Sequence, residues 1–129
     1  MNEECIFCKL VSEKNSDEFI YENENFFSIY DINPELKGHA LVISKKHFQT
    51  IFDLPDELGR DLIDAIKKTG LKLMNKFNGG GFNVINNTNK VAGMIVNHFH
   101  IHILPRKKSD NAILKFIDKD TKEIVGLKK

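Results

Sequence analysis

The sequence predicts an α+β fold, in which an antiparallel sheet is combined with helices. Three observations carry this expectation. Two aromatic and β-branched segments, residues 19–22 and 26–30, flank a polar turn and are typical of a β-hairpin. One long stretch after residue 53 has apolar residues at helical spacing. Further strand-like segments follow it, and short turns between strands favour antiparallel pairing over a wound parallel sheet.

The N-terminal third is expected to hold a short helix and three strands. Residues 5–13 can form a helix with one apolar face. The two hairpin segments follow, and Asn33-Pro34 marks a turn. Residues 38–44, with the sequence Gly-His-Ala-Leu-Val-Ile-Ser, then predict a third strand that is largely buried.

A long helix should follow. Asp53 is the candidate N-cap, and Pro55, Asp56 and Glu57 would fill the first turn, where the helix dipole favours acidic side chains. Apolar and small residues recur at helical spacing along the segment: Leu58, Leu62, Ala65, Ile66, Thr69, Leu73 and Phe77. Gly70 within the helix would cost roughly 1 kcal/mol relative to alanine. Residues 78–81, Asn-Gly-Gly-Gly, should end the helix.

The C-terminal part predicts two more strands. Residues 82–86 form the first, and a polar loop runs through Gly93 to a histidine-containing strand that ends at Pro105-Arg106. Residues 107–129 are lysine-rich with an apolar patch at residues 113–117, and we expect either an edge strand or an arm that docks on a partner. The whole chain, residues 1–129, is expected to be a single domain.

Composition excludes several classes of protein. The net charge of the 129 residues is only +1, so no global field recruits nucleic acid or a membrane surface. The N-terminus is polar and acidic, without a signal peptide or an apolar run of membrane-spanning length. We therefore expect a cytoplasmic protein whose two cysteines, Cys5 and Cys8, stay reduced.

Three of the five histidines fall in one alternating run, residues 98–104. Successive side chains of a strand point to opposite faces, so His98, His100 and His102 should share one face. The other face would be apolar and buried, formed by Phe99, Ile101 and Ile103. Imidazole titrates near neutral pH and can act as nucleophile, proton donor or metal ligand. This strand therefore predicts a functional site rather than a polar surface.

Cys5 and Cys8 are a chelating pair whose thiolates suit zinc. One such pair is a weak signal, since a structural zinc site needs about four ligands. A redox dithiol and a pair of inert cysteines are the alternatives. A thioredoxin-like pair would open a helix in a βαβ unit, and this context differs.

The sequence resembles the histidine triad family of nucleotide-binding proteins, and most closely its bacterial-type branch near Hint. The resemblance extends from Cys5 to Arg106 and includes, in the family's order, Asp31-Ile32-Asn33-Pro34, Gly38-His39-Ala40-Leu41-Val42-Ile43, Lys45-Lys46-His47, Asp53-Leu54, Asn86-Asn87, Ala92-Gly93 and the histidine strand. It implies a five-stranded antiparallel sheet with one long and one short helix, paired as a homodimer. It also implies hydrolysis or transfer at the α-phosphate of a nucleotide.

The same resemblance implies roles for individual residues. His100 would be the nucleophile and form a nucleotidyl-histidine that water later hydrolyses, without a metal in that step. His102 and His39 would hold the phosphate oxygens and orient the nucleophile, although His39 alone could be an ordinary surface histidine. Asn86 is similar to the family's phosphate-contacting asparagine. Asp31 matches the acid that binds the ribose hydroxyls.

Further positions match the family's base pocket and metal site. The residues similar to the apolar walls of the base pocket could equally be plain core: Ile6, Phe7, Leu10, Ile29 and Ile32. His47 and His98 match the ligands that complete a Cys2His2 zinc site with Cys5 and Cys8. Such a closed site would be structural and would tie the N-terminal segment to the sheet.

Two residues depart from the family pattern at the nucleotide site. Met94 replaces the usual glutamine and cannot donate a hydrogen bond, and Ile95 replaces the usual serine or threonine. Losing one preorganised donor typically costs roughly 2.7–4 kcal/mol of barrier. Three functions therefore remain: hydrolysis of a purine nucleoside phosphoramidate or related AMP derivative, cleavage of dinucleoside polyphosphates, and nucleotide-dependent regulation with weak catalysis.

Overall fold

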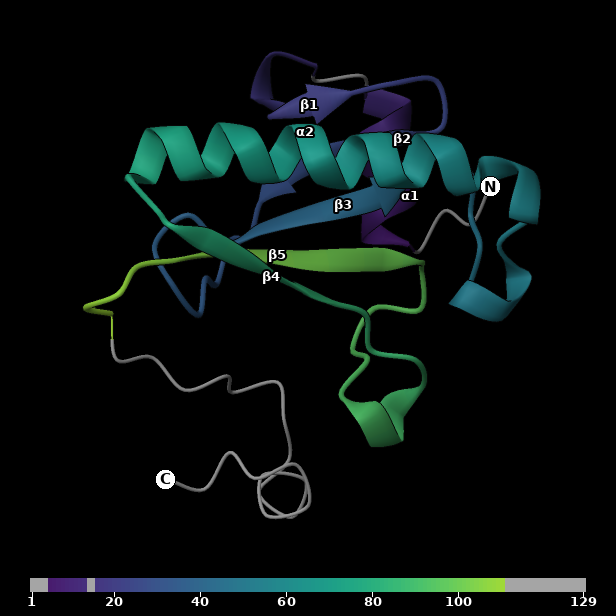
Figure 1. Ribbon diagram of the computed structural model, residues 1–129. Coiled ribbons are helices and arrows are strands. Elements are labelled where there is room, and N and C mark those ends of the chain that lie inside the picture. Colours follow the sequence, from purple (N-terminus) through teal and green to yellow (C-terminus); the bar gives the residue numbers. More distant parts are fainter. Residues whose placement is uncertain (1–4, 14–15, 111–129) are drawn as a thin grey trace.

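The computed structural model describes residues 5–13 and 16–110, and these form an antiparallel sheet covered by helices on both faces (Figure 1). The expected α+β class with a five-stranded antiparallel sheet is confirmed, in the order β1-β2-β3-β5-β4. The strands are β1 Tyr21–Glu22, β2 Phe26–Tyr30, β3 Ala40–Ser44, β4 Gly81–Ile85 and β5 His100–Arg106. The α-helices are α1 Ile6–Glu13 and α2 Gly59–Phe77, and short 3-10 helices occur in the connecting segments.

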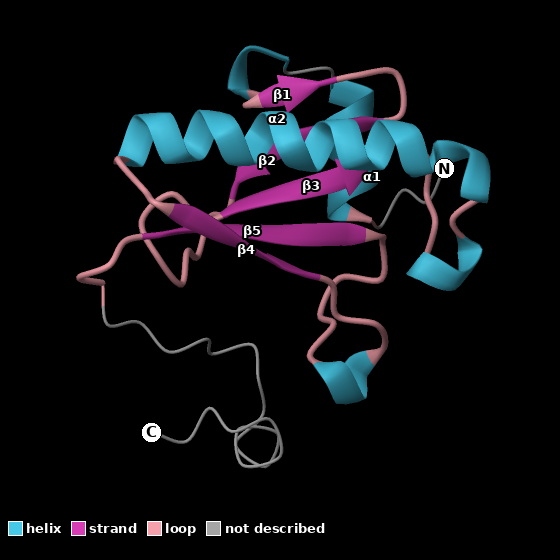
Figure 2. Ribbon diagram, viewed as in Figure 1, coloured by secondary structure: helices cyan, strands magenta, loops and turns pink. Residues whose placement is uncertain are grey.

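The long helix α2 crosses one face of the sheet and α1 covers the other (Figure 2). Alternation along β5 works as expected, because Phe99, Ile101 and Ile103 are buried beneath α2. The opposite face packs Phe27, Leu41 and Ile43 against α1. His100 and His102 therefore lie on the α1 face of the sheet.

The long helix begins later than the sequence indicated. Asp53 is not its N-cap: it ends a short 3-10 helix, Ile51–Asp53, and its carboxylate accepts a hydrogen bond from the Thr50 amide at 3.0 Å. Pro55 is extended, and Asp56 and Glu57 lie in a second 3-10 turn, Asp56–Leu58, before α2 starts at Gly59. The local Thr50–Asp53 capping box competes for the carboxylate that the helix was expected to use.

The other end of α2 behaves as predicted. Asn78 closes the helix in the left-handed conformation, with φ of 53°, and its amide donates to the Met74 carbonyl. Gly70, which appeared to be a weak point, has a packing role. A Cβ there would lie 2.4 Å from the ring of Phe82 on β4, so glycine lets that ring approach the helix.

The histidine strand is shorter than expected. His98 lies in a bend before β5, with its amide donating to the Val96 carbonyl at 2.9 Å. The predicted apolar patch at residues 113–117, and most of the C-terminal arm, lie outside the described residues. Within the described part of the chain, no helix has the length and apolar character needed to cross a membrane.

Candidate functional site

Three histidines meet at the centre of the sheet, on the face that α1 covers. His100 and His102 come from β5, and β5 pairs with β3 so that Ile43 faces His100 and Leu41 faces His102. His39 directly precedes β3, which brings its ring within 5.2 Å of the His102 ring centroid. All three side chains are buried. The residues predicted to form the catalytic group are thus brought together.

The main chain selects the tautomer of His100. Its Nδ1 lies 2.7 Å from the carbonyl oxygen of His98, and a carbonyl only accepts hydrogen bonds. Nδ1 must therefore carry the proton of the neutral ring. The lone pair is left on Nε2, which is the form a nucleophilic imidazole requires.

A second main-chain contact sets the tautomers of His39 and His102. The Glu35 amide donates to His39 Nδ1 at 3.1 Å, so the proton of neutral His39 is on Nε2. That Nε2 lies 3.0 Å from His102 Nδ1 and 3.5 Å from the Asp31 carboxylate. Because His39 Nε2 donates to His102 Nδ1, neutral His102 carries its own proton on Nε2. The pair therefore offers an N–H group beside the nucleophile.

Burial keeps these imidazoles neutral. Burial, together with a smaller effect of the neighbouring His100 and His39 rings, lowers the pKa of His102 from 6.5 to about 3. Burial also lowers the pKa of His100, although its bond to the His98 carbonyl and the charge of Asp31 act in the opposite direction. The pKa of His39 is lowered by burial against the opposing charges of Asp31 and Glu35. At neutral pH the nucleophile therefore keeps its lone pair.

These shifts predict a loss of stability in acid. Between pH 6.5 and about 3 the unfolded chain holds a proton on His102 that the folded protein lacks. The free energy of unfolding should therefore fall as pH drops below 6.5, with a slope of up to about 1.4 kcal/mol per pH unit from this group. Urea unfolding of wild type and His102→Asn between pH 7.5 and 4.5 measures the difference. Equal slopes for the two proteins would contradict the prediction.

A pocket of about 790 Å³ opens above the histidines. His39, His100 and His102 line it together with Asp31, whose second carboxylate oxygen accepts from the Asn33 amide. Every residue predicted to form the apolar wall also lines it: Ile6, Phe7, Leu10, Ile29 and Ile32. The residues predicted for the site thus make up nine of the nineteen that line this pocket.

Two predicted nucleotide-site residues lie elsewhere. Asn86 does not line the pocket: its amide donates to the His100 carbonyl at 3.0 Å and its oxygen accepts from Thr88. Met94 is buried and also does not line it, whereas its neighbour Ile95 lines it and is 89% exposed. Of the two departures from the family pattern, only Ile95 is therefore in contact with the pocket.

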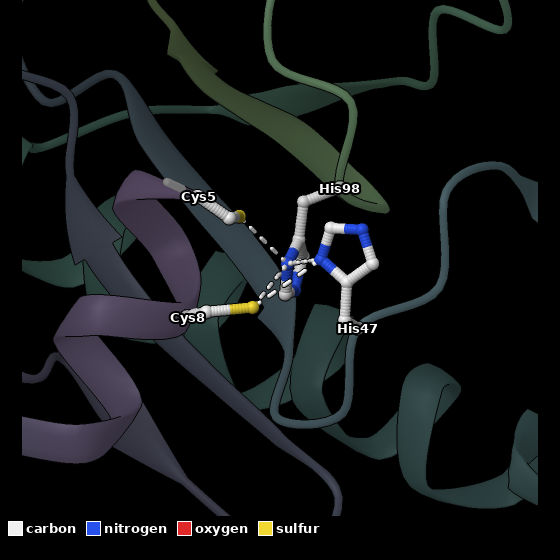
Figure 3. A group of neighbouring side chains, drawn as sticks. All are labelled: Cys5, Cys8, His47 and His98. Atoms are coloured by element: carbon white, nitrogen blue, oxygen red, sulfur yellow. Dashed lines mark hydrogen bonds between the residues drawn. The ribbon is translucent and has the colours of Figure 1, made fainter. Parts of the chain in front are cut away.

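Cys5, Cys8, His47 and His98 form a second cluster of side chains (Figure 3). The cysteines come from the start of α1, His47 from the loop after β3, and His98 from the bend before β5. Cys5 Sγ lies 3.3 Å from His98 Nδ1, Cys8 Sγ lies 3.3 Å from His47 Nδ1, and the two Nδ1 atoms are 3.1 Å apart. All four ligand atoms are within 4.8 Å of one another.

The donor set of this cluster fits zinc. In a tetrahedral S2N2 site, ligand atoms are separated by about 3.3–3.8 Å, close to the spacings seen here. The far nitrogen of His98, Nε2, donates to the Ser44 carbonyl at 2.7 Å, so Nδ1 presents its lone pair to the cluster. A metal-bound histidine normally has such an acceptor at its other nitrogen. The two cysteines are not joined by a disulfide.

The group Asp31, His39 and His102 is also compact enough to hold a metal, but its chemistry does not suit one. A metal at His39 Nε2 would require the proton on Nδ1, where the Glu35 amide already donates. Two N–H groups would then face each other. The backbone contact of each ring therefore decides what its other nitrogen can do. The Ser44 carbonyl holds the proton of His98 on Nε2, so His98 Nδ1 can bind a metal. The Glu35 amide donates to His39 Nδ1, so His39 Nε2 carries a proton instead.

Some contributors to the site carried no sequence signal. The Glu35 amide and the Ser44 and His98 carbonyls set three tautomers, and any residue could supply those groups. The pocket wall also includes Phe19 and Val96, which were not predicted. Their apolar character was visible, but only the fold shows which apolar residues face a pocket and which face the core.

Comparison with known proteins gives a consistent picture. Residues 12–109 match the family model of the HIT domain. An uncharacterised HIT-like protein of Methanocaldococcus jannaschii is 39% identical over 95% of this chain and 99% of its own length. An adenosine 5′-monophosphoramidase of Candida albicans is 34% identical over 80% of this chain and 70% of its own length.

Solved structures agree with the fold. The crystal structure of a zinc-bound histidine triad family protein from Mycobacterium smegmatis superimposes with a TM-score of 0.78. The sequence identity is 33%, and the match covers 92% of this chain and 86% of that one. The five-stranded sheet and its helices are therefore the architecture of that group of proteins.

Proposed function

Because this chain belongs to the histidine triad family defined by the HIT domain, we propose that it is a nucleotide hydrolase acting on AMP derivatives. The substrate we favour is a purine nucleoside phosphoramidate, cleaved at the α-phosphate. The observation that carries the proposal is the hydrogen bond from His100 Nδ1 to the His98 carbonyl. It leaves a lone pair on Nε2 of a histidine that lines the pocket.

In the proposed reaction, His100 Nε2 attacks the α-phosphorus, and the bond from phosphorus to the leaving group breaks. The product of this step is a nucleotidyl-histidine, and the leaving group departs with the bonding electron pair and takes up a proton from solvent. Water then attacks the same phosphorus and loses a proton to solvent. The phosphorus–nitrogen bond breaks with its electron pair returning to Nε2, which releases AMP and restores neutral His100. The His98 carbonyl stabilises the ring throughout, because Nδ1–H donates to it more strongly when the ring becomes positively charged.

The neighbouring groups would stabilise and position the nucleotide. The Nε2–H group of His102 suits a phosphate oxygen, because it donates without the cost of a fixed charge. His39 would orient that ring, because its own Nε2–H donates to His102 Nδ1. The Asp31 carboxylate can accept hydrogen bonds from both ribose hydroxyls. The base would lie against the apolar wall from α1 and β2, which includes Phe7 and Ile29.

The charge of the pocket favours one leaving group over another. Three carboxylates line it, from Glu18, Asp31 and Glu35, and no lysine or arginine appears among the described residues that line it. A polyphosphate chain brings several negative charges that such a pocket would repel. A neutral or cationic amine avoids that penalty. This observation supports phosphoramidate hydrolysis over cleavage of dinucleoside polyphosphates.

The test is a steady-state comparison of adenosine 5′-phosphoramidate with diadenosine tetraphosphate. We expect kcat/KM to be higher for the phosphoramidate by about tenfold or more, since two like charges 4 Å apart repel by about 1 kcal/mol in water and by about 4 kcal/mol near a protein surface. Glu35→Gln should bring the kcat/KM values of the two substrates closer together, because it removes one negative charge that repels the polyphosphate. Glu57→Gln is the matched control, because Glu57 is exposed and does not line the pocket. Faster cleavage of the polyphosphate would instead support the alternative, and tight AMP binding without turnover of either substrate would indicate a regulatory protein.

We also propose that the protein is a homodimer with one structural zinc ion per subunit, held by Cys5, Cys8, His47 and His98. When bound, the metal would cross-link α1 to the sheet and take no part in the reaction. A second subunit is supported by apolar side chains left exposed on the described surface: Val84 on the edge strand β4, and Ile63 and Leu71 on α2. Sedimentation equilibrium should give twice the chain mass of 14.8 kDa.

A further inference from the structure

The helix α1 contributes to both clusters described above. Cys5 directly precedes it and Cys8 lies within it, while Ile6, Phe7 and Leu10 of the same helix line the pocket. A helix of eight residues is too short to be stable alone in water. Its position over the sheet therefore depends on the groups that it contacts.

His98 joins the same two clusters in a second way. Its imidazole Nδ1 faces the sulfurs of Cys5 and Cys8 at 3.3 and 3.6 Å, while its main-chain carbonyl accepts the hydrogen bond from His100. The Phe7 ring has its centroid 5.6 Å from that of His98 and 5.2 Å from that of His100, both in edge-on geometry. A displacement of His98 in the Cys/His cluster would therefore also displace the groups that contact the nucleophile, His100.

The Cys/His cluster links α1 to the bend that carries His98. His98 Nδ1 lies 3.3 Å from Cys5 Sγ and 3.1 Å from His47 Nδ1, in a buried position. A divalent metal held by these four residues would replace the weak thiol–imidazole contacts with metal–ligand bonds, and would so fix α1 to that bend.

We propose that metal binding at the Cys/His cluster and nucleotide binding in the pocket are thermodynamically coupled through α1 and His98. The inference rests on the proposed function, because it requires that the pocket binds AMP. Zinc-loaded protein should bind AMP about 5- to 150-fold more tightly than zinc-free protein, the usual range for coupled sites. By linkage, saturating AMP should raise zinc affinity by the same factor.

Calorimetry of AMP binding to zinc-loaded and zinc-free protein tests whether zinc raises the affinity for AMP. Far-UV circular dichroism records whether the zinc-free protein is folded. Competition with a chelator, with and without AMP, tests whether AMP raises the affinity for zinc. Equal AMP Kd values in folded zinc-free and zinc-loaded protein would overturn the coupling and leave the proposed function intact. If zinc-loaded protein does not bind AMP, the proposed function itself fails.

Two variants separate coupling from ordinary wall contacts. Phe7→Ala removes the ring that contacts both His98 and His100, and should bring the ratio of the two AMP Kd values close to one. Ile29→Ala is the matched control: it shortens a wall residue on β2, so it should weaken AMP binding in both states and preserve the ratio. A ratio that survives Phe7→Ala would contradict the role of this contact.

If the zinc-free protein unfolds, cobalt(II)-loaded protein supplies the measurement. Cobalt(II) accepts the same tetrahedral ligands, and its visible absorption reports the geometry of the site. We expect AMP to change these bands with a midpoint at the Kd found by calorimetry, and Phe7→Ala to reduce the change. A spectrum that stays constant at saturating AMP would overturn the proposal.

Discussion

His100→Ala is expected to lower turnover of an AMP phosphoramidate by at least about a thousandfold, the scale on which removal of a nucleophile acts in covalent catalysis. No other histidine that lines the pocket has the same arrangement. His39 and His102 both have lowered pKa values, but their Nδ1 atoms are occupied as acceptors, from the Glu35 amide and from His39. Among the three pocket histidines, only His100 has its proton held by a carbonyl.

The covalent intermediate provides a direct measurement. Rapid quench of the enzyme with labelled substrate should yield an adenylated protein that is labile in acid and stable in base, as expected for a phosphorus–nitrogen bond. The adduct should be missing in His100→Ala, while AMP binding by calorimetry is retained. Wild-type turnover in His100→Ala, together with its loss in His102→Ala, would move the nucleophile to His102.

The sequence was most informative where backbone geometry alone determines where a side chain points. Alternation along β5 correctly separated His100 and His102 from Phe99 and Ile101, because strand side chains must alternate. The Cys–Cys spacing and one turn of helix likewise place both sulfurs on one side of α1. These features depend on local periodicity, which a sequence contains in full.

The sequence was least informative where the main chain supplies the chemistry. No residue type marks the Glu35 amide or the Ser44 carbonyl, yet these groups decide which imidazole can bind metal and which carries a proton. Met94 and Asn86 show the related difficulty for side chains. The family resemblance suggested that both contact the nucleotide, but Met94 is buried without lining the pocket and Asn86 donates to the β5 backbone.

Removal of the proposed zinc is expected to lower stability by several kcal/mol, since structural zinc contributes its binding free energy to folding. Cys5→Ser/Cys8→Ser should lose the metal and unfold at lower temperature than wild type. Elemental analysis of protein purified without chelator should find about one zinc per wild-type chain and none in the variant. Chelator should lower the Tm of wild type and leave that of the variant unchanged.

The loop that carries His47 offers a matched comparison. His47→Ala removes one ligand and should lose zinc affinity, whereas Lys46→Ala changes the exposed neighbouring residue and should keep both zinc and Tm. Metal-free wild type, or equal zinc in the double cysteine variant, would return Cys5 and Cys8 to a redox or inert role. If zinc held only α1, its loss would detach that helix and leave the sheet folded. Because His98 also anchors the bend before β5, we expect the sheet to unfold together with α1, at a lower Tm and in one cooperative transition.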